Sequence, residues 1–270
     1  MPVFIDQLHR KLEINSLPKR IISLVPSQTE LLYDLGLRDE VVGITKFCIH
    51  PDEWFRTKER VGGTKKLDFE KIKQLQPDLI IGNKEENEQV QIEELMKHYT
   101  VWMSDIYTLK DALDMITCVG NLIGKQKEAI YLKLEIESKF NAFKFEQSTV
   151  NRQTSFKTKT AYFIWNKPFM VAGNTTFINE MLIVCGLENV FLNKASRYPE
   201  VSVEEIKAAN PDVILLSSEP YPFKEKHIQE MQHVCPSAKI QIVDGELFSW
   251  YGSRLLKSPA YFSELIKMLE

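Results

Sequence analysis

Two glutamates occupy matching positions in a segment that the chain contains twice. LDFEKIKQLQPDLII (67–81) and VSVEEIKAANPDVIL (201–215) align without a gap at an offset of 134 residues. In each copy a capping residue precedes a short helix, a Pro-Asp pair ends it and a buried strand follows. The alignment pairs Glu70 with Glu204 in the first helical turn. A carboxylate there complements the helix dipole by about 0.3–1 kcal/mol, so a purely structural role is one interpretation of both residues.

The residues that could hold a metal ion do not form a closed ligand set. His50 lies near Cys48 and Asp52, and His233 is followed closely by Cys235, but neither group supplies four placed ligands. We therefore expect no bare-metal site. Three other histidines are expected on the solvated surface: His9, His98 and His227. The four cysteines are widely spaced without a CxxC pair, which predicts free, mostly buried thiols.

Motifs for catalysis are missing from the sequence. It contains no GxSxG, no GxGxxG after a strand and no P-loop lysine, and its one glycine pair lies in Gly62–Lys65. We expect a binding protein with no catalytic residues and no intrinsic cofactor.

Alternating strands and helices must position these residues. Short apolar runs predict strands at 20–25, 41–45, 78–82 and 100–103 in the first half, and at 161–165, 213–216 and 240–243 in the second. Helical patterns between them include one from Ser27 or Thr29, either of which could cap it, to Gly36. Further helices are predicted at 68–76, 88–99, 109–119, 175–185, 202–209, 224–233 and 259–269. This alternation is typical of parallel sheets covered by helices.

One helix is much longer than the others. Apolar residues recur at helical spacing from Lys125 to about Glu146 without Gly or Pro, so the helix would span roughly 30 Å. The polar stretch 147–159 predicts a surface connection. We expect an N-terminal α/β lobe over 1–124, a connecting helix over 125–147 and a C-terminal α/β lobe over 148–270.

The composition agrees with two lobes and limits the partners. The chain has 270 residues, 44% of them hydrophobic and 26% charged, and a formal net charge of −3. A net negative charge does not favour binding to nucleic acid or to an anionic membrane. No apolar run is long enough for membrane insertion. A small molecule or a protein is the expected partner.

Several segments together resemble a known family. They are KRIISLVPSQTEL (19–31), the two glutamate-containing repeats, NKPFMVAG (166–173) and YPEVS (198–202). These resemble the substrate-binding proteins of bacterial ABC importers for metal chelates, and are most similar to the cobalamin-binding subfamily, with siderophore- and haem-binding relatives. The resemblance covers about 5–269 and implies two Rossmann-like α/β lobes, with mainly parallel sheets, joined by a single long helix.

The resemblance also implies functional residues. In this family one glutamate on each lobe meets arginines of the permease, which assigns docking to Glu70 and Glu204. The ligand, a corrinoid, ferric siderophore or haem, lies in a cleft between the lobes. The implied cleft residues are Pro26, Ser27, Gln28, Phe47, Thr64 and Asn83 from the first lobe, and Trp165, Tyr198, Phe248, Trp250 and Tyr251 from the second. Thr64 and Asn83 stand where cobalamin binders tend to carry tryptophan.

The family resemblance implies a monomer that works outside the cytoplasmic membrane. Residues 1–19 lack the apolar core of a secretory signal, so a leaderless cytoplasmic binder, or an enzyme acting on a tetrapyrrole or metal cofactor, stays open as the alternative.

Overall fold

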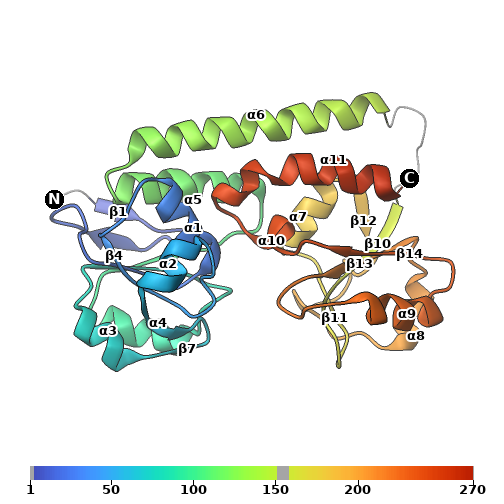
Figure 1. The fold of residues 1–270 in the computed structure, drawn as a ribbon, viewed down its shortest axis with the longest axis horizontal. Helices are drawn as coiled ribbons and strands as arrows, with labels where there is room; N and C mark the ends of the chain where they lie inside the picture. The colour runs from blue at the N-terminus through green and yellow to red at the C-terminus, as the bar shows by residue number, and fades with distance from the viewer. Residues whose placement is uncertain (1–2, 151–157, 270) are drawn as a thin grey trace. The chain divides into compact units, whose positions relative to one another are not determined.

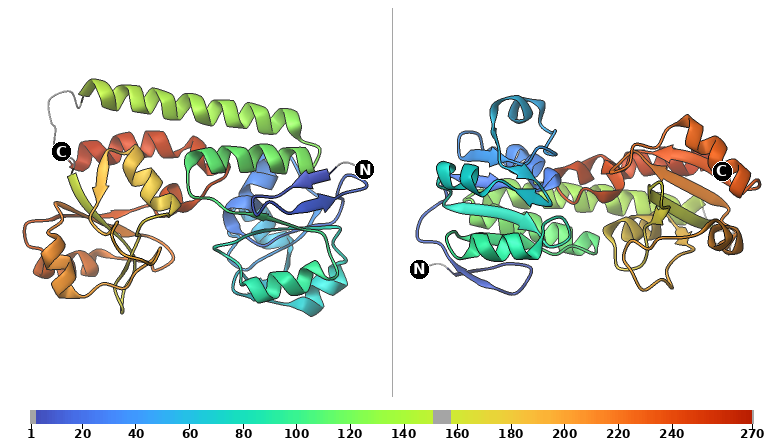
Figure 2. Two further views of the ribbon diagram at one scale, coloured as in Figure 1. Left: turned by 180° about the vertical axis from the view of Figure 1, so that it is seen from behind. Right: turned by 90° about the horizontal axis from the view of Figure 1, so that it is seen from below.

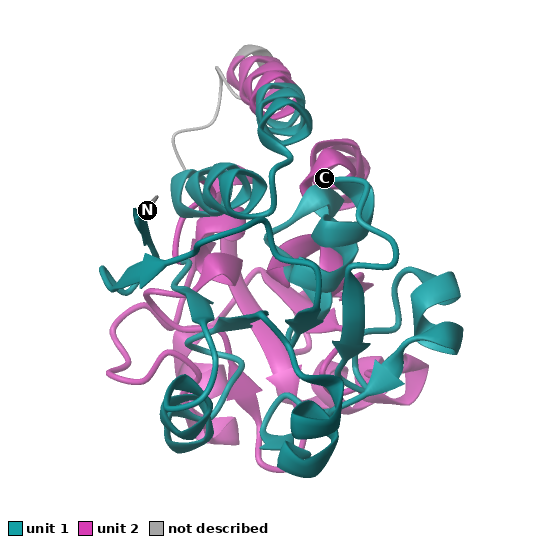
Figure 3. Cartoon of the chain, turned by 90° about the vertical axis from the view of Figure 1, so that its left-hand side faces the viewer, with its two compact units in different colours: residues 1–106, 110–136, 250–254 teal, residues 107–109, 137–249, 255–270 magenta. Residues whose placement is uncertain are grey.

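The chain forms two compact units. The computed structural model describes residues 3–150 and 158–269. Unit 1 is drawn from residues 1–106, 110–136 and 250–254, and unit 2 from residues 107–109, 137–249 and 255–270 (Figure 3). The short segment 250–254 therefore belongs to unit 1, although its neighbours on both sides in the sequence belong to unit 2.

Unit 1 contains a parallel sheet with helices packed against it (Figure 1). Within the described residues the strand order is β5-β4-β3-β8-β9, and every pairing is parallel. Two small antiparallel hairpins, β1–β2 and β6–β7, accompany it. The strands are β1 (Val3–Ile5), β2 (Lys11–Glu13), β3 (Ile21–Ser23), β4 (Val41–Ile44), β5 (Glu59–Arg60), β6 (Gly62–Gly63), β7 (Lys66–Leu67), β8 (Leu79–Asn83) and β9 (Val101–Ser104). The helices are α1 (Pro26–Asp34), α2 (Asp52–Thr57), α3 (Phe69–Leu75), α4 (Gln89–Met96) and α5 (Leu109–Leu122).

Unit 2 contains a second, mainly parallel sheet. Among its described strands the order is β11-β10-β13-β14, with β12 also paired to β10, and only β11 runs antiparallel. The strands are β10 (Thr158–Trp165), β11 (Met170–Val171), β12 (Leu187–Asn189), β13 (Val213–Ser217) and β14 (Lys239–Val243). The helices are α7 (Phe177–Val184), α8 (Val203–Ala209), α9 (Glu225–Val234), α10 (Glu246–Ser249) and α11 (Ser258–Leu269), and a 3₁₀ helix, η2, covers Ser253–Leu256.

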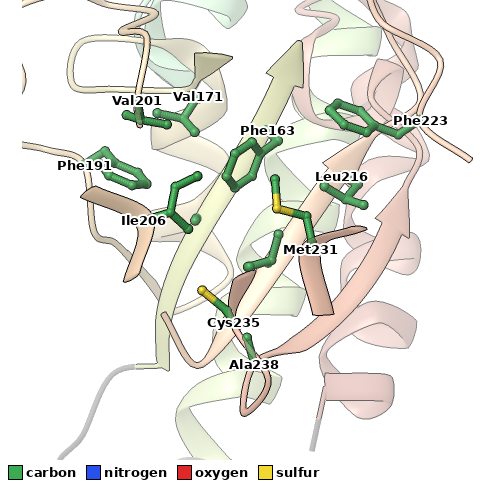
Figure 4. Close-up of a cluster of buried hydrophobic side chains, with 12 residues drawn as sticks. Phe163, Val171, Phe191, Val201, Ile206, Leu216, Phe223, Met231, Cys235 and Ala238 are labelled. Carbon is green, nitrogen blue, oxygen red and sulfur yellow. The ribbon is translucent and has the colours of Figure 1, made fainter. Parts of the chain in front are cut away.

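The core of unit 2 lies between the sheet and helices α8 and α9. Phe163 on β10, Ile206 on α8 and Met231 on α9 are completely or almost completely buried in one apolar cluster (Figure 4). The expected fold class is confirmed: both units are α/β and their sheets are mainly parallel.

The long helix α6 (Gln126–Val150) is seen from two sides in Figure 2. It begins in unit 1 and continues into unit 2 (Figure 3). Its predicted start is confirmed within one residue. The helix extends to Val150, so the expected surface connection from residue 147 begins later than predicted; residues 151–157 of that stretch lie outside the described part of the chain.

The repeated segments have the same conformation in both units. Gln76 ends α3 with φ 44° and ψ 61°, and Asn210 ends α8 with φ 44° and ψ 63°. The next aspartates then make matching bonds: the Asp78 N–H donates to Arg20 O at 2.9 Å, and the Asp212 N–H donates to Lys159 O at 2.8 Å. The repeat inferred from the sequence is thus confirmed at the level of backbone geometry.

The start of α1 differs from the expected one. The helix begins at Pro26, whose fixed φ suits a first helical position, and Val25 occupies the cap position without a side-chain bond. Ser27 and Thr29 therefore lie inside the helix, and neither caps it. Its end is as predicted: Gly36 adopts φ +89°, a conformation that glycine reaches without a Cβ clash.

Candidate functional site

The two repeat glutamates occupy the same position in their helices. Glu70 is the second residue of α3 and Glu204 the second residue of α8, and both are exposed. Asp68 caps α3 by accepting from the Lys71 N–H at 3.0 Å, and Ser202 caps α8 by accepting from the Glu205 N–H at 3.2 Å. The capping side chains are thus Asp68 at α3 and Ser202 with Glu205 at α8, not the repeat glutamates.

Neither repeat glutamate forms an ion pair with a described residue. Hydrogen bonds from its own backbone N–H and from the Ser202 hydroxyl lower the pKa of Glu204. Its neighbour Glu205 is engaged differently, because it completes the capping box with Ser202 and pairs with Lys194. Glu70 and Glu204 therefore remain available for a cationic partner.

A buried polar cluster occupies the carboxyl ends of the strands in unit 1. The Gln28 Nε2 donates to Ser104 Oγ at 2.6 Å, and the Asn83 Nδ2 donates to the same oxygen at 2.9 Å. The Asn87 Oδ1 accepts from the Asn83 N–H at 2.9 Å, and its Nδ2 donates to Thr64 O at 3.1 Å. Gln28, Thr64 and Asn83 are thus brought together by one network.

Two members of this network, Asn87 and Ser104, were missed by the sequence analysis. Polar residues that end or closely follow a buried strand were the signal that could have found them, since Ser104 ends β9 and Asn87 follows β8. The carboxyl ends of parallel strands are where ligands bind in open α/β sheets.

Phe47 is the exposed aromatic residue next to this cluster. Its side chain is 50% exposed, and the Lys46 Nζ lies 4.9 Å from its ring centroid. A Cβ added to Gly63 would lie 3.2 Å from Phe47 Cε2, so the ring packs on the β6–β7 hairpin, whose turn contains Thr64. Pro26 is half-buried, whereas Ser27, Gln28, Thr64 and Asn83 are buried.

Trp250 and Tyr251 do not lie with the second lobe as expected. Their segment belongs to unit 1, where Arg254 binds Glu30 through two hydrogen bonds of 2.8 Å each. The Arg254 guanidinium also lies 4.6 Å from the Trp250 ring centroid, and Trp250 contacts His50 edge-on at 5.7 Å. Both aromatic residues are buried. Their burial depends on contacts with residues that are remote in the sequence.

Unit 2 presents Trp165 at the end of β10. Its side chain is 40% exposed and contacts Tyr221 edge-on at 5.6 Å. The Tyr221 hydroxyl lies 3.1 Å from His227 Nε2, and the Lys224 N–H donates to His227 Nδ1 at 2.8 Å. His227 is therefore a buried, hydrogen-bonded residue, and its expected surface position was wrong; His9 and His98 are exposed as expected.

The other two aromatic residues predicted from the second lobe lie in different environments. Tyr198 is half-buried, and its N–H donates to Ser196 Oγ at 3.3 Å. Phe248 is fully buried against Phe262 and Tyr162, with ring centroids 4.7 and 5.2 Å away. The Phe248 ring is therefore packed in the core of unit 2, unlike the exposed ring of Trp165.

The cysteines are free thiols, as predicted. Burial raises the pKa of Cys48, whose Sγ lies 3.1 Å from the Thr29 hydroxyl, and burial also raises the pKa of Cys185.

Within residues 3–150 and 158–269, no group of three or more His, Cys, Asp or Glu side chains could hold a metal ion. No helix in these ranges combines the length and apolar character needed to span a membrane.

Comparison with known proteins identifies the family. The model of the periplasmic binding protein family matches residues 21–234. The vitamin B12-binding protein of Vibrio parahaemolyticus is 27% identical over 218 residues, covering 80% of this chain and 76% of that protein. The chain belongs to the periplasmic binding protein family.

Solved structures agree with this fold. The periplasmic vitamin B12-binding protein BtuF of Vibrio cholerae superposes with a TM-score of 0.79 at 22% identity, covering 93% of this chain and 98% of that one. A periplasmic haem-binding protein from Pseudomonas aeruginosa gives a TM-score of 0.79 at 19% identity, covering 92% of each chain. These relatives are named as binding proteins and not as enzymes.

Proposed function

We propose that this chain is the substrate-binding component of an ABC importer and captures a metal chelate: a corrinoid, a ferric siderophore or haem. The observation that carries the proposal is membership of the periplasmic binding protein family together with relatives named for vitamin B12 and haem. Chelates of this kind are large, flat and partly apolar, so their recognition needs aromatic surface as well as a few polar groups.

The exposed aromatic residues support a flat ligand. Phe47 in unit 1 and Trp165 in unit 2 each follow or end a strand of a parallel sheet. Each residue is 40% or more exposed, which leaves aromatic surface available to a ligand. We propose that these rings contact the chelate, together with Pro26, Ser27, Gln28, Thr64, Asn83, Tyr198, Trp250 and Tyr251.

Titration with defined chelates tests the proposal. We expect cyanocobalamin, haemin or a ferric siderophore to give saturable heat and a change in chelate absorbance. Trp165→Ala should weaken binding by about 1–3 kcal/mol, the cost of losing a large apolar contact. Tyr131→Ala, at an exposed aromatic residue of α6, is the matched control and should bind as wild type. A response to sugars or amino acids, with none to any chelate, would refute the proposal.

Delivery to a permease is the second part of the proposal. We propose that Glu70 and Glu204 bind arginines of the permease, since directional Arg–carboxylate pairs would let one membrane partner engage both units. Their shared helix position and lack of an ion pair with any described residue support this role.

The double variant Glu70→Gln/Glu204→Gln separates docking from folding. We expect chelate affinity and melting temperature near those of wild type, but loss of uptake in vesicles reconstituted with the permease, because each broken interfacial charge pair costs about 2–5 kcal/mol. Glu93→Gln/Glu225→Gln removes one exposed helical carboxylate from each unit and should keep uptake. Full uptake by the first variant would exclude docking through these residues.

We further propose that the protein acts as a monomer on the outer side of the cytoplasmic membrane, as the family's name and its periplasmic relatives suggest. Cell fractionation with a cytoplasmic marker tests the location, and light scattering of the purified chain tests the monomer. Recovery with the cytoplasmic marker, or a mass of twice 31.4 kDa, would contradict these proposals.

A further inference from the structure

Tyr221 lies at the centre of an aromatic cluster in unit 2. Its ring centroid is 4.9 Å from that of Phe223 and 5.4 Å from that of His227. It is also 5.6 Å from the ring centroid of Trp165. Phe223 belongs to the buried core of unit 2 (Figure 4), whereas Trp165 is 40% exposed. Tyr221 therefore connects the exposed indole to the core.

Tyr221 also contacts both sequence neighbours of Trp165. Its N–H donates to Ile164 O at 3.4 Å, and Asn166 Nδ2 lies 3.5 Å from its hydroxyl oxygen. Asn166 is 6% exposed, and its Oδ1 has no partner among the described residues. Reversing the amide would turn Oδ1 toward the hydroxyl and leave Nδ2 without a partner instead. In either orientation the Asn166 side chain contacts Tyr221.

His227 contacts Tyr221 with one ring nitrogen and caps α9 with the other. The Lys224 N–H donates to Nδ1 at 2.8 Å, so Nδ1 holds a lone pair and the ring hydrogen is on Nε2. Lys224 O also lies 3.1 Å from Nδ1, but it already accepts from the His227 N–H at 2.8 Å. The Nε2–H group then donates to the Tyr221 hydroxyl oxygen at 3.1 Å.

The cap alone does not require histidine. The residue at this position of a capping box is usually Glu or Gln, whose side chain accepts from the N–H of the cap residue. Histidine adds a donor on the far side of a rigid ring, and this ring is 3% exposed and packs edge-on against Phe223 at 5.3 Å. The bond to Tyr221 is what histidine contributes beyond the helix start.

We propose that His227 is a positioning residue for chelate binding, an inference that rests on the proposed contact between Trp165 and the chelate. His227 fixes the Tyr221 ring, and Tyr221 in turn holds the Trp165 indole in one rotamer before the ligand arrives. Ordering a side chain on binding costs affinity, so an indole that is already held binds more tightly than one that must be ordered.

Removing one hydroxyl group tests this chain of contacts. Tyr221→Phe keeps the ring beside Trp165 but loses the hydroxyl contacts with His227 and Asn166. The probe is whichever of cyanocobalamin, haemin and ferrichrome wild-type protein binds most tightly. We expect Tyr221→Phe to bind it about two- to tenfold more weakly than wild type, the range for ordering one side chain.

Tyr261→Phe is the matched control in the same unit. Tyr261 is also half-buried, and its hydroxyl accepts from the Asp244 N–H at 2.8 Å. The variant should bind the probe as wild type does.

A double-mutant cycle separates positioning from direct contact with the ligand. In a Trp165→Ala background, Tyr221→Phe should change affinity less than twofold, because the indole that Tyr221 positions is gone. A loss as large as in the wild-type background would show that Tyr221 itself contacts the chelate, and would refute the positioning role.

Fluorine NMR of protein labelled with 5-fluorotryptophan tests the same role without a ligand. The Trp165 signal is assigned by its absence from Trp165→Phe. It should broaden or double in Tyr221→Phe and in His227→Asn, and stay single and sharp in Tyr261→Phe. His227→Asn keeps an acceptor on Cγ for the Lys224 N–H but loses the Nε2 donor.

The outcomes separate this inference from the proposed function. If chelates bind wild-type protein and Tyr221→Phe keeps either full affinity or a single sharp Trp165 signal, the positioning role is refuted and the importer function stands. If no chelate binds, the proposed function fails, and a role of His227 in binding fails with it. If His227→Asn does not fold, Tyr221→Phe still decides.

Discussion

Charged side chains in this chain differ in whether another residue of the protein pairs with them. Arg254 and Glu30 satisfy each other through two short hydrogen bonds, with side chains 9% and 12% exposed. Glu70 and Glu204 are exposed carboxylates that pair with no described cation. Residues of the first kind stabilise the fold, and residues of the second kind are the ones that a partner can use.

We predict that Arg254→Met lowers the free energy of unfolding by about 3–5 kcal/mol, because it leaves the mostly buried Glu30 carboxylate without its cation. Urea unfolding at pH 7 measures the change. Glu30→Gln/Arg254→Met should recover part of the loss, since it removes both charges. A single variant as stable as wild type would show that the pair does not support the fold.

The buried thiols predict an alkaline loss of stability. Burial raises the pKa values of Cys48 and Cys185 in the folded chain, so the unfolded chain ionises first as pH rises. Their contribution is complete below the ordinary thiol pKa of about 8.5 and declines above it. Urea midpoints from pH 7 to 10 should fall less steeply for Cys48→Ala/Cys185→Ala than for wild type; equal slopes would contradict the assignment.

At the scale of elements, the strength of the sequence pattern decided what could be predicted. The continuous apolar runs of β3, β8 and β13 identified buried strands, and the gapless repeat identified α3 and α8. The hairpins β1–β2 and β6–β7 were missed, because strands of two or three residues carry no periodic signal. The start of α1 was predicted wrongly, because the sequence offers both a proline suited to the first helical position and two side chains suited to a cap.

The residues of the candidate site also divide into those that a sequence pattern identifies and those that it does not. Glu70 and Glu204 could be found because the repeat aligns them. The environments of Phe248 and Trp250 could not, because the partners that bury Phe248 include Tyr162, 86 positions earlier, and Trp250 contacts His50, 200 positions earlier. Local sequence carries no information about such pairs.

The helix caps give a prediction at this scale. Ser202→Ala removes the α8 capping box and should cost about 1 kcal/mol of unfolding free energy, and Asp68→Ala should cost a similar amount at α3. Ser263→Ala, within α11, is the control and should change stability by less than about 0.5 kcal/mol. Thermal melts measure all three. No loss in either cap variant would show that these first turns are held by other contacts.

For the whole molecule, the contact pattern does not follow the order of the chain. Unit 1 takes residues 250–254 from near the C-terminus, and unit 2 takes residues 107–109 from the first half. A cut within α6 consequently produces two fragments that each lack part of a unit.

We predict that the fragment 1–136 is less stable than unit 1 of the intact chain, because it lacks the Glu30–Arg254 pair and the close contact of Gly252 with α1. Hydrogen exchange of β3 and β8 amides in both proteins measures the difference. Adding a peptide of residues 248–256 should partly restore protection, and a peptide with Arg254→Met should restore less. Equal protection in fragment and intact chain would contradict the prediction.

The placement of residues 250–254 also determines when the protein can finish folding during synthesis. N-terminal domains generally fold first as a chain leaves the ribosome. Here Glu30 is synthesised more than 200 residues before Arg254, its partner in unit 1, and unit 2 still requires α11 after that. Neither unit can reach its final contacts before residues 250–269 have been synthesised. A chain terminated at residue 245 would leave both units unfinished, because residues 250–254 belong to unit 1 and α11 belongs to unit 2.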